Sequence, residues 1–82
     1  MKNFSLNQIV EGRYESGRCF GTFLIIGFSY EKKERWATVK EVNPLDCSEM
    51  LSQKLSLPVV CLVPIGTKMT SRQRDRFREW IG

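Results

Sequence analysis

Phosphate binding is the chemistry that the end of this sequence suggests most directly. Residues 68 to 82, KMTSRQRDRFREWIG, carry five positive and two negative charges, and so supply three of the four net positive charges of the 82-residue chain. Arginine donates two parallel hydrogen bonds to a phosphate, and an aromatic neighbour can stack on an exposed base. We therefore expect five residues to contact nucleic-acid phosphates without strong sequence preference: Lys68, Arg72, Arg74, Arg76 and Arg78.

A helix is expected to carry these residues. Phe77, Trp80 and Ile81 recur at steps of three and four, which is typical of a helix. Thr70 and Gln73 have the spacing of a capping box, which marks a helix start. The sequence therefore predicts an amphipathic helix within residues 67–82.

The arginines would divide between the two sides of this helix. At about 100° per residue, Arg72 and Arg76 lie on one side of the apolar stripe, and Arg74 and Arg78 lie on the other. The stripe either docks on the rest of the protein, with the arginine stems along its rim, or stays free for a partner.

The residues that catalysis and metal binding need are scarce. The chain has no histidine, so the commonest general base is absent, and its acidic residues show no spacing of paired catalytic carboxylates. Cys19, Cys47 and Cys61 are widely spaced, which favours reduced thiols over a disulfide framework or a zinc site. We expect no enzyme, no cofactor and no metal.

Composition indicates one folded domain. The chain is 41% hydrophobic and 27% charged, which is ordinary for a soluble globular protein. Its longest apolar runs are far shorter than the roughly 20 residues of a membrane-spanning helix. The first 15 residues lack the apolar stretch of a signal peptide, so we expect a cytoplasmic protein.

Strand patterns fill the first half of the chain. Residues 8–14 predict a short strand, followed by a turn at residues 15–17. Residues 19–30 predict a long, curved strand with glycines at its bends, and residues 35–42 predict its hairpin partner. The charged run EKKE, residues 31–34, is interpreted as a solvated hairpin tip.

A crossover helix and a buried strand are expected next. Asp46 and Glu49 fit a second capping box, which predicts a short helix over residues 48–54. The apolar run VVCLVPI, residues 59–65, predicts a buried final strand. Residues 1–66 would then form one β domain, with residues 67–82 as a helix packed on it or projecting from it.

This order of elements resembles the SH3-like small barrels of the KOW and Tudor type. The resemblance covers roughly residues 6–65: QIVEGRY as the entering strand, Gly17 and Gly21 around the first turn, ATVKEV as a central strand, and CLVPI as the closing one. It implies a mainly β fold, a small SH3-like barrel with a short crossover helix and a C-terminal helix. It also implies binding of nucleic acid or of peptide segments, and seldom catalysis.

A protein partner is the alternative. Aromatic residues are common anchors of protein interfaces, and the strands together with the tail offer more of them than a small core needs. The alternative interface consists of Tyr14, Phe28, Tyr30, Trp36 and Trp80. The chain would then be a protein-interaction module or an accessory subunit of a larger assembly, and exposed strand edges in so short a chain also allow a homodimer.

Overall fold

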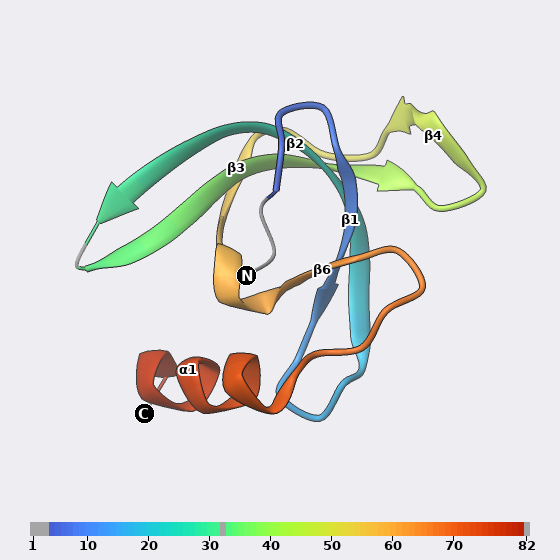
Figure 1. Cartoon of the computed structure of the whole chain (residues 1–82). Coiled ribbons are helices and arrows are strands. Elements are labelled where there is room, and N and C mark those ends of the chain that lie inside the picture. The colour runs from blue at the N-terminus through green and yellow to red at the C-terminus, as the bar shows by residue number, and fades with distance from the viewer. Residues whose placement is uncertain (1–3, 32, 82) are drawn as a thin grey trace.

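A bent antiparallel sheet with one helix beneath it makes up the protein (Figure 1). The computed structural model describes residues 4–31 and 33–81. Within them the elements follow in the order β1 (Ile9–Arg13), β2 (Cys19–Glu31), β3 (Glu34–Asn43), β4 (Asp46–Met50), β5 (Leu55–Pro58), the 3-10 turn η1 (Val59–Cys61), β6 (Leu62–Pro64) and α1 (Ser71–Ile81).

The long strand β2 connects the two halves of the sheet. It pairs with β1 from Cys19 to Leu24 and with β3 from Thr22 to Glu31. The register shifts between Ile25 and Gly27, so the expected curvature at this glycine is confirmed. The strand order is β4-β3-β2-β1-β6, and β5 pairs with the same edge of β3 as β4 does.

The core lies inside the bend of the sheet. Val10, Ile25 and Val39 from three neighbouring strands are fully buried, and Leu62 and Val63 of β6 join them. The alternation of buried and half-buried residues along β1 and β3 is the pattern of strands with one face inward. The predicted hairpin of residues 19–30 and 35–42 is therefore confirmed, and Glu31 and Glu34 form the pair nearest its tip.

The helix α1 begins where the capping box predicted. The backbone N–H of Gln73 donates to Thr70 Oγ1 at 3.1 Å, and that of Thr70 donates to Gln73 Oε1 at 3.0 Å. Phe77 is only 9% exposed and belongs to the same apolar cluster as the strands, so the helix docks on the sheet. Gln73 Nε2 also donates to the carbonyl of Leu62 at 3.0 Å, which ties the first turn of α1 to β6.

The predicted crossover helix over residues 48–54 is wrong. Residues 46–50 form strand β4 instead, and the Asp46 carboxylate accepts hydrogen bonds from Ser48 Oγ at 2.6 Å and Ser48 N at 3.1 Å, which lowers the pKa of Asp46. Met50, Leu51 and Leu55 are more than two-fifths exposed, so the burial of their side chains contributes little toward holding a helix in this segment. The open edge of β3 provides backbone hydrogen-bond partners for this segment, which pairs with it as β4.

The predicted final strand is shorter than residues 59–65. Pro58 has a φ of −65° and leads into the 3-10 turn η1, so β6 covers Leu62–Pro64 alone. The expected burial of this run is confirmed, because Val60, Cys61, Leu62 and Val63 are all buried.

The capping box supports a first test. Thr70→Ala removes the acceptor for Gln73 N, and we expect it to lower the free energy of unfolding by about 1 kcal/mol in urea denaturation. Ser71→Ala, one residue later on the exposed side, is the matched control and should change it by less than about 0.5 kcal/mol. Equal effects of the two variants would show that the cap does not hold this helix.

Candidate functional site

A crevice runs between α1 and the start of β3. Arg72, Arg76 and Trp80 follow one another at four-residue steps, so they form one stripe along α1 with about 6 Å of axial rise between neighbours. Glu34 and Trp36 come from the opposite wall, at the beginning of β3. We call the space between these two walls the helix–hairpin crevice.

One half of the crevice is a hollow of about 530 Å³ with an apolar floor. We call it the basic hollow. Its floor includes the buried ring of Phe4 and the side chains of Val59 and Val60 from η1, and three arginines complete the basic part of its lining. The lining residues are Phe4, Glu34, Arg35, Val59, Val60, Thr70, Arg72, Gln73 and Arg76.

Arg35 is held in place in this lining. Its guanidinium carbon lies 4.4 Å from the centre of the Phe28 ring, a cation–π contact that leaves the side chain exposed at its polar end. Arg72 is exposed as well, and neither Arg35 nor Arg72 has an ion pair with any carboxylate of residues 4–31 and 33–81. Both guanidinium groups therefore remain available to an anion.

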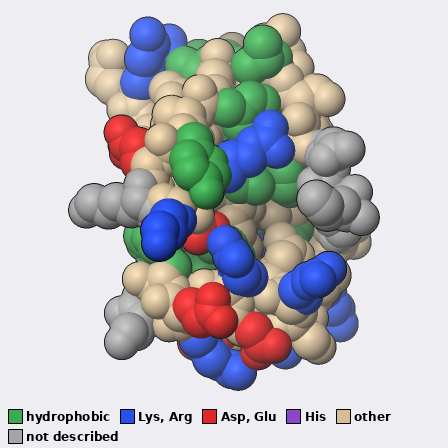
Figure 2. Space-filling model, turned by 60° about the vertical axis from the view of Figure 1, so that its left-hand side comes forward, with side chains coloured by type: hydrophobic (Ala, Val, Ile, Leu, Met, Phe, Trp, Pro, Cys, Tyr) green, Lys and Arg blue, Asp and Glu red, His purple; other side chains and the backbone are tan. Residues whose placement is uncertain are grey.

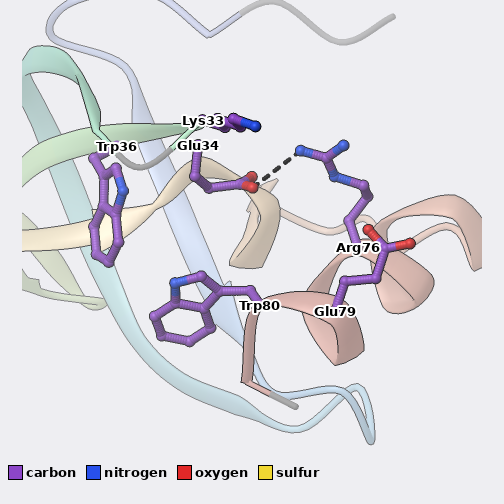
Figure 3. Close-up of a pocket in the computed structure, with 6 residues that line it drawn as sticks. All are labelled: Lys33, Glu34, Trp36, Arg76, Glu79 and Trp80. Carbon is purple, nitrogen blue, oxygen red and sulfur yellow. Dashed lines mark hydrogen bonds and ion pairs between the residues drawn. The ribbon is translucent and has the colours of Figure 1, made fainter.

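The other half is a hollow of about 480 Å³ lined by Lys33, Glu34, Trp36, Arg76, Glu79 and Trp80 (Figure 3). We call it the indole hollow. The two indole rings meet nearly edge to face, with centroids 5.7 Å apart and planes at 73°. Figure 3 shows both indoles on one side of the hollow and the Arg76 and Glu79 side chains on the other. Trp80 keeps 43% of its surface exposed.

An ion pair lies where the two hollows meet. Arg76 Nη2 lies 3.0 Å from Glu34 Oε2, and both residues line both hollows. The side chain of Glu34 is only 17% exposed, so the interpretation of the whole EKKE run as a solvated tip is wrong for this residue. Glu34 lies 42 residues before Arg76 in the chain, so no local sequence pattern could predict the contact between them.

The other two helix arginines point to the opposite flank. Arg78 forms ion pairs with Glu15 and with Asp75, and the Glu15 carboxylate raises the pKa of Arg78. Arg74 is half-buried and passes close to Gly17, which has a φ of 92° in the turn between β1 and β2. The predicted division of the arginines between two sides of the helix is confirmed.

The five residues predicted to bind phosphate are therefore not one surface. Arg72 and Arg76 line the crevice, Arg74 and Arg78 face the turn between β1 and β2, and Lys68 is exposed in the segment before α1. Figure 2 shows the face that carries the left-hand side of Figure 1: basic side chains are spread across it, with acidic side chains between them. The basic hollow therefore differs from the rest of this face in its shape and lining, and not in lying within a continuous basic surface.

The predicted aromatic interface is also divided. Trp36 and Trp80 meet in the crevice, whereas Phe28 lies under Arg35. Tyr14 packs on Phe20 with ring centroids 4.8 Å apart and is 49% exposed, and Tyr30 is 72% exposed near the hairpin tip. The sequence pattern pointed to Trp36 and Trp80 but gave no means of pairing them.

A second polar cluster surrounds Glu11 and serves the fold. Partial burial alone would raise the pKa of Glu11, but hydrogen bonds from Arg13 Nη2 at 2.8 Å, Gly66 N at 3.3 Å and Cys19 Sγ at 3.8 Å lower it overall. These bonds fasten the chain after β6 to β1. Among the described residues, no group of three acidic, Cys or His side chains is placed to hold a metal ion.

No protein-family model matches the chain, and no curated protein or solved structure matches it either. None of the helices in the described part of the chain is long and apolar enough to cross a membrane. The geometry of the crevice is therefore the basis for a functional assignment.

Burial at Cys61 generates a second test. Burial raises the pKa of the Cys61 thiol from 9.0 to about 12 and its Sγ donates to the Pro58 carbonyl, so the native protein should react with iodoacetamide at Cys19 and Cys47 but not at Cys61. Mass spectrometry after labelling near pH 8.5, with a urea-unfolded control, measures this.

The same shift predicts a pH dependence. A thiol whose pKa is raised on folding stabilises the fold fully below about 9, and that contribution is lost as the pH rises toward about 12. Cys61→Ala should flatten this alkaline decline in stability. Rapid native labelling of Cys61 would contradict its place in the core.

Proposed function

We propose that this chain is a non-catalytic binding module that contacts nucleic-acid phosphates through the basic hollow, without strong sequence preference. The observation that carries the proposal is that three arginines, Arg35, Arg72 and Arg76, line one hollow with an apolar floor. Planar guanidinium groups suit phosphate oxygens because each donates two parallel hydrogen bonds. The contact with Phe28 reduces the entropy that Arg35 would lose on binding.

The start of α1 strengthens this preference for an anion. The cap residue Thr70 lines the basic hollow together with Arg72 and Gln73 of the first turn, so the positive end of the helix dipole adds to the arginine charges there. Around the whole crevice Lys33, Arg35, Arg72 and Arg76 face two carboxylates, those of Glu34 and Glu79. The balance is positive, which favours a negatively charged ligand over a basic peptide.

We also propose that the fold is a small SH3-like barrel of the KOW or Tudor type. The arrangement that supports this is the bent strand β2, which serves both halves of the sheet, and the pairing of the first strand β1 with the last strand β6. Such barrels bind nucleic acid or peptides. The fold alone selects no site, so the site is assigned from the crevice.

Protein docking is the second candidate function, and one observation favours it. Four large apolar side chains are exposed around the outer edge of the sheet near β4, and such groups often mark an interaction surface. This outer-edge patch consists of Leu45 at 95%, Met50 at 44%, Leu51 at 51% and Leu55 at 41% exposure. Binding through it would depend little on salt, whereas phosphate binding weakens steeply as salt rises.

Removal of the rim charges tests the proposal. The double variant Arg35→Ala/Arg72→Ala should weaken binding to a labelled oligonucleotide about tenfold or more, and reduce the slope of log K against log salt by about 1.5, in fluorescence anisotropy. The matched control is Arg74→Ala/Arg78→Ala, which removes the same charge from the opposite flank of α1. If the two variants lose affinity equally, the basic hollow is not the binding site.

Release of Arg76 tests it in the opposite direction. Glu34→Gln breaks the ion pair at 3.0 Å and frees the guanidinium for a phosphate, so we expect affinity to rise about threefold to tenfold. Glu15→Gln changes the net charge equally and removes one of the two carboxylate partners of Arg78 on the far flank, so it controls for net charge alone. An equal gain in both variants would argue for general attraction.

A further inference from the structure

We infer that the ligand is a single strand of nucleic acid, whose backbone follows the basic hollow and whose neighbouring base stacks on Trp80 in the indole hollow. This inference rests on the proposed function and specifies the class of nucleic acid. The juxtaposition that carries it is a stacking surface and a phosphate-binding rim on consecutive turns of one helix, facing the same wall.

Continuity between the two hollows is the first step. Arg72, Arg76 and Trp80 form one stripe on α1, and Arg76 and Glu34 line both hollows. A ligand bound by Arg72 and Arg76 therefore reaches the indole hollow within one more helical turn, about 6 Å of axial rise. Phosphate and base of neighbouring nucleotides can occupy the two hollows together.

The state of Trp80 is the second step. Its contacts with Phe77 and Trp36 are both steeply inclined, at 61° and 73° between ring planes, so neither is a parallel stack. With 43% of its surface exposed inside a hollow, the indole offers apolar area to a flat partner. Stacking of a base on such an aromatic residue contributes about 1–3 kcal/mol and tolerates any base.

The shape of the crevice is the third step, and it favours a single strand over a duplex. In double-stranded DNA the flat faces of the bases are covered by their neighbours, and only base edges are accessible in the grooves. Arg72, Arg76 and Trp80 face the β2–β3 hairpin across hollows of about 530 and 480 Å³, so they do not form a projecting face that could enter a groove. A base can reach Trp80 once it is unstacked, as in a single strand.

Charge supports the same ligand. Lys33 and Arg76 stand at the rim of the indole hollow, so a phosphate on the far side of the stacked base also meets a positive group. Glu34 is already neutralised by Arg76 at 3.0 Å. The single uncompensated acid that lines the described part of this hollow is Glu79, which is exposed and can turn away from the strand.

The test compares strands and duplexes on the full-length protein. Labelled oligo-dT and oligo-rU of about 12 nucleotides and a DNA duplex of the same length are titrated at equal salt. We expect both single strands to bind at least tenfold more tightly than the duplex. Trp80→Ala should lower single-strand affinity about 5-fold to 100-fold without changing duplex affinity, and Trp80→Phe should keep most of it.

Tryptophan fluorescence keeps the test independent of how well Trp80→Ala folds. The chain has two tryptophans, so Trp36→Phe leaves Trp80 as the reporter, and oligo-dT should quench its emission while free phosphate should not. Duplex binding as tight as single-strand binding, or emission that stays unchanged at saturation, overturns this inference but leaves the proposed phosphate site standing. Failure of every oligonucleotide to bind overturns both.

Discussion

Burial of Phe77 beneath the sheet is the contact on which the rest of the structure depends. The ring joins an apolar cluster built from β1, β2, β3 and β6. It thereby holds α1, a helix of 11 residues, against strands that lie far away in sequence. Complete burial of one large aromatic side chain contributes about 2–3 kcal/mol, a large share of the stability of so small a domain. Gln73 fixes the orientation of the first turn of α1, because its side-chain amide donates hydrogen bonds to the carbonyls of Val60 and Leu62.

Docking decides what the charged residues of α1 can do. With Phe77 pointing into the core, the remaining positions divide between two flanks: Arg72 and Arg76 face the hairpin, and Arg74 and Arg78 face the turn between β1 and β2. The same orientation of α1, with Phe77 in the core, places Trp80 beside Trp36. The docked helix therefore presents two flanks of different chemistry, because Arg72 lines an open hollow whereas Arg78 is ion-paired with Glu15 and Asp75.

Local patterns in the sequence were reliable where short-range contacts decide the structure. The capping box at Thr70 and the β2–β3 hairpin both depend on residues close in sequence, and both were predicted. The helix expected after Asp46 failed, because its capping pattern competed with an open strand edge on β3 that only the folded sheet provides. The pairing of Glu34 with Arg76 and the meeting of the two indoles depend on how α1 docks, and composition and spacing contain no record of that.

The ion pair at the centre of the crevice stays in place when a ligand binds. Arg76 Nη2 is bonded to Glu34, and the Glu34 side chain is only 17% exposed, so complete transfer of Arg76 to a phosphate would leave a largely buried carboxylate unpaired. A strand of phosphates can instead occupy Arg72 and Arg35, which the described carboxylates leave unpaired, while Arg76 keeps Glu34 and offers its remaining N–H donors. Binding therefore adds contacts at two arginines and retains the ion pair at the third. On this basis the number of arginines that line the basic hollow sets the affinity. The Trp80 indole beside them sets the preference for single-stranded over double-stranded nucleic acid.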